Sequence, residues 1–160
     1  MTRLAQLAWR HPDGWLATFA GVGLAPRAPG TCGSLAALVP AWFLLALPPL
    51  AQLGVIVAGF AIGVWACSRF EARLGDHDNG AIVWDEVIGV WITLFAAPQA
   101  AWVLVAGFVL FRIFDILKPP PVSWADDRIG GGLGVMLDDV LAAVLAWICL
   151  AVLLRFLPVG

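Results

Sequence analysis

The chain has 160 residues, of which 62% are hydrophobic and 12% are charged, and its mean hydropathy is +0.94. Soluble domains are only about 45–50% apolar and about 25% charged, so the composition argues against a soluble enzyme and indicates one integral membrane domain over residues 1–160. The net charge of −2 gives no support for nucleic-acid binding. The three cysteines form no Cys-x-x-Cys pair, which argues against a zinc site or a disulfide framework.

The N-terminal segment carries Arg3 and Arg10, but His11, Pro12, Asp13 and Gly14 interrupt the apolar run that follows. A secretory signal needs a continuous apolar core, so we expect this segment to be retained. Residues 1–33 are predicted to form a cytoplasmic or interfacial segment that ends in a phosphate-binding loop. Residues 34–157 are predicted to form the helical bundle.

Five continuous apolar segments follow. They span residues 34–50, 52–68, 81–97, 100–117 and 135–157. Continuous rather than alternating apolar runs favour helices, and an open sheet edge cannot face lipid. A helix of ~17 residues rises ~25 Å against a hydrocarbon core of ~30 Å, so polar groups at its ends should lie near the interface. The predicted fold is therefore an all-α integral membrane bundle of about five short membrane helices.

Two further features of these segments predict local structure. Pro40 lies inside the first segment and is expected to kink it. Gly54, Gly59 and Gly63 in the second segment favour close contacts between helices, and they also permit a homo-oligomer.

The acidic residues gather at the ends of the apolar segments. Nine of the eleven lie in three clusters: Asp76, Asp78, Asp85 and Glu86; Asp115; and Asp126, Asp127, Asp138 and Asp139. Because successive helices alternate in direction, all three clusters are predicted to lie on one membrane face, together with every basic residue except Arg155. Charged groups beside lipid are costly, so this placement indicates a functional site. The excess of basic residues makes that face cytoplasmic, with the N-terminus inside and the C-terminus outside.

A Pro/Gly-rich stretch precedes the first apolar segment. Its glycines let backbone amides approach an anion, and Thr31 or Ser34 is suited to cap a helix whose N-terminus favours negative charge. We therefore predict phosphate binding by Gly30, Thr31, Gly33 and Ser34. An ordinary Pro/Gly turn with a serine cap explains the same residues.

The strongest local signal is His77-Asp78, followed by Asp85-Glu86 at the start of the third segment. Adjacent carboxylates repel each other unless a cation lies beside them, and hard oxygen ligands suit Mg²⁺. The alternative for Asp85 and Glu86 is compensation of a helix dipole. His77 is suited to transfer a proton near neutral pH, although a histidine in a surface loop often has no such role.

Two further motifs lie later in the chain. Arg112, Asp115 and Lys118 alternate cation, carboxylate and cation at the end of the fourth segment, a pattern suited to a phosphate and a metal, or to snorkelling basic residues with a local ion pair. A glycine run at 131–134 then leads to Asp138 and Asp139 at the start of the fifth segment. It is not a dinucleotide fingerprint, because no βαβ unit surrounds it.

Taken in order, these motifs resemble bacterial phosphatidylglycerophosphatase A. The matching residues are Pro29, Gly30, Thr31, Gly33 and Ser34; His77, Asp78, Gly80, Asp85 and Glu86; Arg112, Asp115, Lys118 and Pro119; and Asp126, Gly131, Gly132, Gly134, Met136, Asp138 and Asp139. The resemblance implies a Mg²⁺-dependent lipid phosphatase, multi-pass in the bacterial inner membrane, that converts phosphatidylglycerophosphate and water to phosphatidylglycerol and inorganic phosphate. Members of the family can carry a histidine where this chain has Asn79.

The predicted site combines metal, phosphate and proton transfer. We expect Asp78, Asp85, Glu86, Asp138 and Asp139 to hold Mg²⁺, with Asp115 and Asp126 assisting, and Arg112, Lys118 and the amides of residues 30–34 to balance the phosphate charge. The catalytic residues are expected to be His77, Asp78, Asp85, Glu86 and Asp139. Water or an aspartate is the nucleophile.

Two alternative functions use the same carboxylates. A membrane cation transporter or channel is one, but such proteins place their binding groups near the midplane. A phosphatase or phosphotransferase for another phosphorylated lipid is the other. The apolar tail of a lipid contacts only generic apolar surface, so the residues alone do not separate these lipid substrates.

Overall fold

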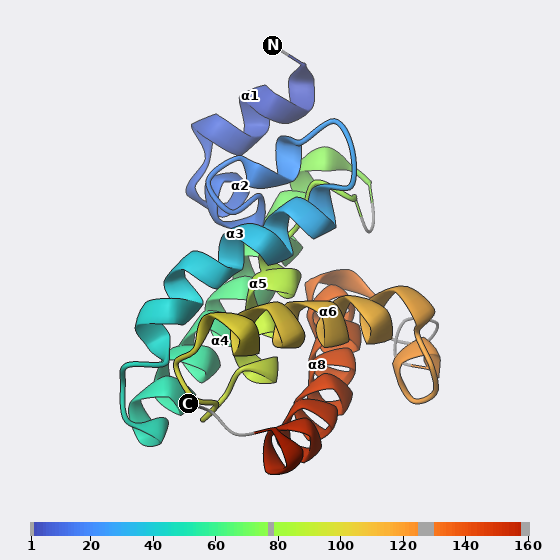
Figure 1. Ribbon diagram of the computed structural model, residues 1–160. Helices are drawn as coiled ribbons and strands as arrows, with labels where there is room; N and C mark the ends of the chain where they lie inside the picture. Colours follow the sequence, from blue (N-terminus) through green and yellow to red (C-terminus); the bar gives the residue numbers. More distant parts are fainter. Residues whose placement is uncertain (1, 77–78, 125–129, 158–160) are drawn as a thin grey trace.

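The computed structural model describes residues 2–76, 79–124 and 130–157, and within these ranges it consists of helices without a strand (Figure 1). The predicted all-α class is confirmed. His77, Asp78 and Asp126 lie outside the described residues, so their roles stay predictions. The helices of the bundle are α3 (Pro29–Leu44), α4 (Pro49–Leu74), α5 (Trp84–Thr93), α6 (Ala101–Leu117) and α8 (Gly131–Phe156).

The N-terminal region contains helices that the hydropathy pattern did not predict: α1 (Arg3–Arg10), α2 (Pro12–Ala17) and the short η1 (Val22–Leu24). Thr2 caps α1 by accepting a hydrogen bond from the amide of Ala5. Asp13 of α2 is 2% exposed and accepts a 2.7 Å charged hydrogen bond from Nε of Arg73 near the end of α4. The N-terminal helices are thereby fixed to α4.

Helix α5 occupies the centre of the bundle. It packs against α3, α4, α6 and α8 (Figure 1), and its Val87, Ile88 and Val90 are fully buried. A helix that is apolar on all sides is typical of a core position. Because α5 is surrounded, its first residues are brought close to the neighbouring helices.

The helix boundaries differ from the predicted segments in ways that local chemistry explains. Helices α3 and α4 begin at Pro29 and Pro49, because proline suits the first turn of a helix. Helix α4 continues past residue 68 until Gly75, whose φ of 69° ends it in the left-handed region. Residues 30–34 therefore form the start of α3 instead of a loop, and Ala28 is its N-cap. The prediction that Thr31 or Ser34 caps this helix was wrong.

Small residues allow the helices to approach closely, as predicted. A Cβ on Gly59 would lie 2.8 Å from Ile88 of α5, and one on Gly63 would lie 2.9 Å from the sulfur of Met136 of α8. These glycines are therefore used for packing within the chain. Gly54 has no other atom within 4 Å of a Cβ position. The predicted homo-oligomer stays a prediction.

Within the described residues, two helices, α4 and α8, are long and apolar enough to cross a membrane. Large apolar side chains also project from the bundle surface, among them Val57, Val105 and Val152, each more than half exposed. An exposed apolar surface of this kind is consistent with a membrane protein.

Candidate active site

Four helices contribute residues to one cavity of about 400 Å³. The start of α3, the start of α5, the end of α6 and the first third of α8 meet there, as the alternating helix directions predicted. The lining residues are Ala28, Pro29, Gly30, Thr31, Gly80, Ile82, Asp85, Glu86, Arg112, Asp115, Ile116, Lys118, Asp138 and Asp139.

Three carboxylates form the most acidic part of the cavity. Oxygen atoms of Asp85, Glu86 and Asp139 all lie within 4.8 Å of one another. Asp139 is only 4% exposed, and among the described residues Oε2 of Glu86 and Oδ2 of Asp139 have no hydrogen-bond partner. Clustered carboxylates repel one another and lose hydration on burial, so this arrangement favours binding of a cation or uptake of a proton.

The donor set fits Mg²⁺. This ion prefers oxygen ligands and is commonly held by a few carboxylates, and the cluster presents two buried oxygens that lack partners. Among the described residues, Asp85, Glu86 and Asp139 are therefore best placed to hold it. Asp115 and Asp138 line the same cavity, but each is paired with a basic side chain.

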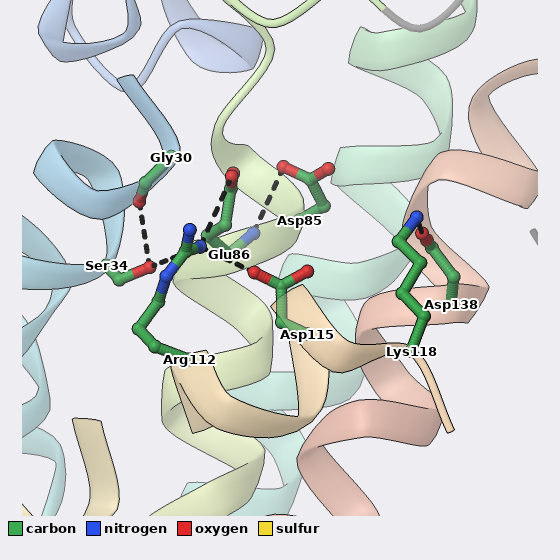
Figure 2. Close-up of polar contacts among 8 residues, drawn as sticks. All are labelled: Gly30, Ser34, Asp85, Glu86, Arg112, Asp115, Lys118 and Asp138. Carbon is green, nitrogen blue, oxygen red and sulfur yellow. Dashed lines mark hydrogen bonds and ion pairs between the residues drawn. The ribbon is translucent and has the colours of Figure 1, made fainter. Parts of the chain in front are cut away.

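Arg112 is the centre of a polar network beside this cluster (Figure 2). Its Nη1 lies 2.6 Å from Oδ2 of Asp115 and 3.9 Å from Oε1 of Glu86, and it donates a hydrogen bond of 3.4 Å to the hydroxyl of Ser34. The helical spacing of three had predicted the contact with Asp115. The network fixes a guanidinium at the edge of the carboxylate cluster.

Lys118 supplies a second cation on another side of the cavity. Its Nζ lies 2.9 Å from Oδ2 of Asp138, and Figure 2 shows this pair apart from the Arg112 network. Lys118 ends α6 in the left-handed region, with φ of 42°, immediately before Pro119. The chain turns here because proline disfavours helix at the preceding residue.

The start of α3 faces the same cavity. Gly30 and Thr31 line it, and the amides of a first helical turn have no carbonyl partner within the helix, which suits them to bind an anion. A Cβ at Gly30 would collide with Oε1 of Glu86. A side chain at position 30 would therefore have to displace the carboxylate of Glu86 from its place in the cluster.

The other two residues predicted to bind phosphate, Gly33 and Ser34, are buried and are not among those that line the cavity. A Cβ on Gly33 would lie 2.7 Å from Cβ of Val83, so Gly33 permits contact between α3 and the start of α5. Ser34 is 0% exposed and donates to the carbonyl of Gly30 at 2.8 Å. Its hydroxyl therefore supports the backbone of Gly30 and the guanidinium of Arg112.

Asn79 has a structural contact that the motif analysis missed. Its Oδ1 accepts a hydrogen bond from the amide of Ala81, and its Nδ2 donates one to Asp76. These bonds shape the turn that brings Gly80 and Ile82 to the cavity. The Asn-Gly dipeptide, which is typical of turns, was the available signal.

Away from this cavity, two hollows between described residues are lined by apolar side chains. One lies among Leu53, Ile56, Ile92, Phe95 and Trp147, and another lies between Phe95 and Leu154. A transported cation would have no polar ligands there.

Comparison with known proteins gives consistent matches over most of the chain. Residues 15–154 match the family described as Phosphatidylglycerophosphatase A. The chain is 46% identical over 144 residues to a phosphatidylglycerophosphatase A of Escherichia coli, covering 89% of this chain and 83% of the relative. It is 43% identical over 145 residues to that of Haemophilus influenzae, covering 89% of each.

A third relative bears a different name. The chain is 41% identical over 140 residues to a Bacteroides thetaiotaomicron protein named "Putative phosphatidylinositol-3-phosphatase", covering 82% of this chain and 87% of that protein. No solved structure matches the chain.

Proposed function

The chain belongs to the phosphatidylglycerophosphatase A family, and from this premise we propose that its cavity hydrolyses phosphatidylglycerophosphate to phosphatidylglycerol and inorganic phosphate with the help of Mg²⁺. The family makes the chain a phosphatase, as the sequence motifs predicted. One observation supports the Mg²⁺ proposal above all: the carboxylate cluster of half-buried Asp85 and Glu86 and buried Asp139 shares a cavity with two basic side chains and a helix N-terminus.

In this proposal Asp85, Glu86 and Asp139 hold the metal. Asp115 and Asp138, which line the same cavity, assist them. Asp78 and Asp126 are assigned the same assisting role from the sequence motifs alone. When bound, Mg²⁺ would withdraw electron density from the phosphoryl oxygens and lower the pKa of a bound water. The cation would favour the charged form of the carboxylates and would offset part of the cost of burying them.

The basic groups bind and orient the phosphate. Arg112 presents a guanidinium held by Asp115 and Ser34, and Lys118 presents an ammonium on another side of the cavity. The first amides of α3 at Gly30 and Thr31 add dipoles that favour negative charge. These groups offset the charge that develops on the phosphoryl oxygens during hydrolysis.

Hydrolysis forms a bond between a water oxygen and phosphorus and breaks the bond between phosphorus and the glycerol oxygen. The departing glycerol oxygen must take up a proton, and the candidate donors are His77 and a metal-bound water. The rival pathway forms an aspartyl phosphate on one of the carboxylates. Isolation of a phosphorylated aspartate during turnover would exclude direct attack by water.

The proposed placement is multi-pass in the inner membrane, with about five membrane helices, the cavity on the cytoplasmic side and the C-terminus outside. The distribution of basic residues supports it, since all but Arg155 belong to the predicted cytoplasmic face. Single cysteines placed at Gly75 and Ala51 in a cysteine-free chain test this topology. A membrane-impermeant thiol reagent applied to intact cells should label only the cysteine at position 51.

The central experiment is phosphate release from phosphatidylglycerophosphate by the wild type, Asp85→Asn and Asp139→Asn, each with and without Mg²⁺. We expect the wild type to lose activity on chelation and to recover it when Mg²⁺ is restored, whereas both variants stay inactive. Full activity after chelation, or in both variants, would overturn the metal proposal. Cation flux in proteoliposomes without phosphate release would favour a transporter.

A second candidate substrate class is another phosphorylated lipid, and the name of the Bacteroides relative favours its inclusion. Phosphatidylinositol 3-phosphate should therefore be assayed beside phosphatidylglycerophosphate. We expect a higher kcat/KM for phosphatidylglycerophosphate, because the two relatives with the higher identity bear that name. The opposite order of kcat/KM would reassign the substrate while leaving the phosphatase activity intact.

A further inference from the structure

An apolar groove on α6 begins at the catalytic cavity. It is lined by Phe108, Val109, Arg112, Ile113, Ile116 and Leu117, and its exposed lining is apolar throughout. Arg112 and Ile116 also line the cavity that contains the carboxylates. The groove and the cavity therefore adjoin each other at these two residues.

Helical spacing explains the shape of the groove. Its residues form the pairs 108–109, 112–113 and 116–117, which are four positions apart and so follow one face of α6. From Phe108 to Leu117 this face is ~14 Å long. Arg112 contributes its hydrocarbon stem to the groove while its guanidinium contacts Asp115, as long basic side chains commonly do.

The groove leaves large apolar side chains exposed next to a charged site. Ile116 is 67% exposed and Leu117 is 71% exposed, although Asp115 and Lys118 adjoin them in the chain. Contact of such side chains with water is unfavourable, so we expect an apolar group to cover them.

We propose that this groove binds an acyl chain of the phosphorylated glycerolipid, so that the first carbons lie at Ile116 and Leu117 and later carbons reach Val109 and Phe108. This inference rests on the proposed function, because it places the lipid phosphate in the adjoining cavity. In a glycerolipid only the glycerol unit separates phosphate from acyl chains, and Ile116 is shared by both binding regions. The apolar hollow beside Trp147 shares no residue with the cavity and is not assigned this role.

The position of Val109 at the far end of the groove gives a sharp test. Val109→Trp should block the part that only a long chain reaches, so kcat/KM should fall by about tenfold for substrate with sixteen-carbon chains. For substrate with six-carbon chains, kcat/KM should fall by a clearly smaller factor. The measured quantity is the ratio of the two kcat/KM values, each determined in the same detergent micelles.

Val57→Trp is the matched control, because Val57 is also exposed on a bundle helix but lies outside the groove. Its ratio should equal that of the wild type. An unchanged ratio in Val109→Trp, or an equal fall in Val57→Trp, would overturn the groove assignment. If the tryptophan variant does not fold, Val109→Phe gives the same test with a smaller side chain. Failure of the wild type to hydrolyse either substrate would instead overturn the proposed function.

Discussion

The two ends of the helical bundle satisfy their polar groups in opposite ways. At the end remote from the cavity, neutral side chains bond to backbone: Gln52 donates to the carbonyl of Leu47 and accepts from the amide of Ala96, both at 2.9 Å. Gln99 donates to Trp42, and Trp147 donates to Phe95. At the cavity end, charged side chains are gathered, and Glu86 and Asp139 retain buried oxygens without a partner among the described residues.

This difference indicates that the neutral side chains at the remote end stabilise the fold and that the charged side chains of the cavity serve the reaction. Neutral polar groups with complete hydrogen bonding stabilise a buried turn at little electrostatic cost. Clustered carboxylates destabilise the folded chain unless a bound cation neutralises their charge. Substitutions at the remote end should therefore lower stability alone, whereas substitutions of the side chains that line the cavity should lower activity alone.

The largest effect is expected for Asp139→Asn. It removes one charge of the carboxylate cluster and should lower kcat by about 100-fold or more. The thermal stability of the protein in detergent should stay equal or rise, because repulsion with Asp85 and Glu86 decreases. Steady-state phosphate release and thermal unfolding followed by tryptophan fluorescence measure the two quantities.

Asp13→Asn is the matched control for this variant, because Asp13 is equally buried but is paired with Arg73. It should lower the free energy of unfolding by about 1–3 kcal/mol and leave kcat unchanged. A loss of kcat in Asp13→Asn as large as that in Asp139→Asn would contradict the separation of the two roles.

Gly30→Ala should have the next largest effect. The added Cβ collides with the carboxylate of Glu86, and displacement of this group by about 1 Å is expected to lower kcat/KM by up to about 100-fold. Gly54→Ala is the control, because apart from the nearby backbone of its own helix no atom lies within 4 Å of its Cβ position. Alanine at 54 should leave kcat/KM unchanged and raise helix stability slightly.

Gln52→Leu tests the remote end. The substitution leaves the amide of Ala96 without its acceptor, and we expect the free energy of unfolding to fall by about 1–3 kcal/mol. The kcat of the folded protein should not change. Gln6→Leu, on the exposed face of α1, should change stability by less than about 0.5 kcal/mol. A substantial loss of kcat in Gln52→Leu would show that the two ends are coupled.

The smallest effect is expected for Ser34→Ala. It removes the hydroxyl that accepts a hydrogen bond from Arg112, but Asp115 still holds the guanidinium. One such hydrogen bond corresponds to about 1 kcal/mol, so kcat/KM should fall about fivefold. Because Ser34 is placed behind Arg112 and outside the cavity, a loss as large as that of Gly30→Ala would indicate direct contact with phosphate.

The sequence was sufficient to predict the gathering of the acids. Continuous apolar runs gave helices, and the alternation of their directions brought Asp85, Asp115 and Asp139 to the same cavity. Helix α6 was predicted almost to the residue, since its apolar run ends where Lys118 precedes a proline. These predictions depend only on where each helix begins and ends in the sequence. Hydropathy and the positions of prolines indicate those boundaries directly.

The rotation of each helix about its axis was not predictable in the same way. Whether Ser34 faces phosphate or Arg112 depends on the packing of Gly33 against Val83, a contact between residues 50 positions apart. The pairing of Asp13 with Arg73, 60 residues apart, is invisible to a local pattern for the same reason. Helices α1 and α2 were missed because they are short and their apolar run is interrupted.

The attachment of α2 to α4 has a practical consequence for protein production. Gly14 lies so close to α1 and α4 that a Cβ there would be 2.8 Å from Cα of Ala8 and 2.9 Å from the ring of Phe70. A truncated expression clone that omits the first twenty residues, on the assumption that they form a dispensable leader, would uncover Phe70 and leave Arg73 without its acid. Such a clone should yield aggregated protein, and an N-terminal affinity tag should be separated from Thr2 by a flexible spacer.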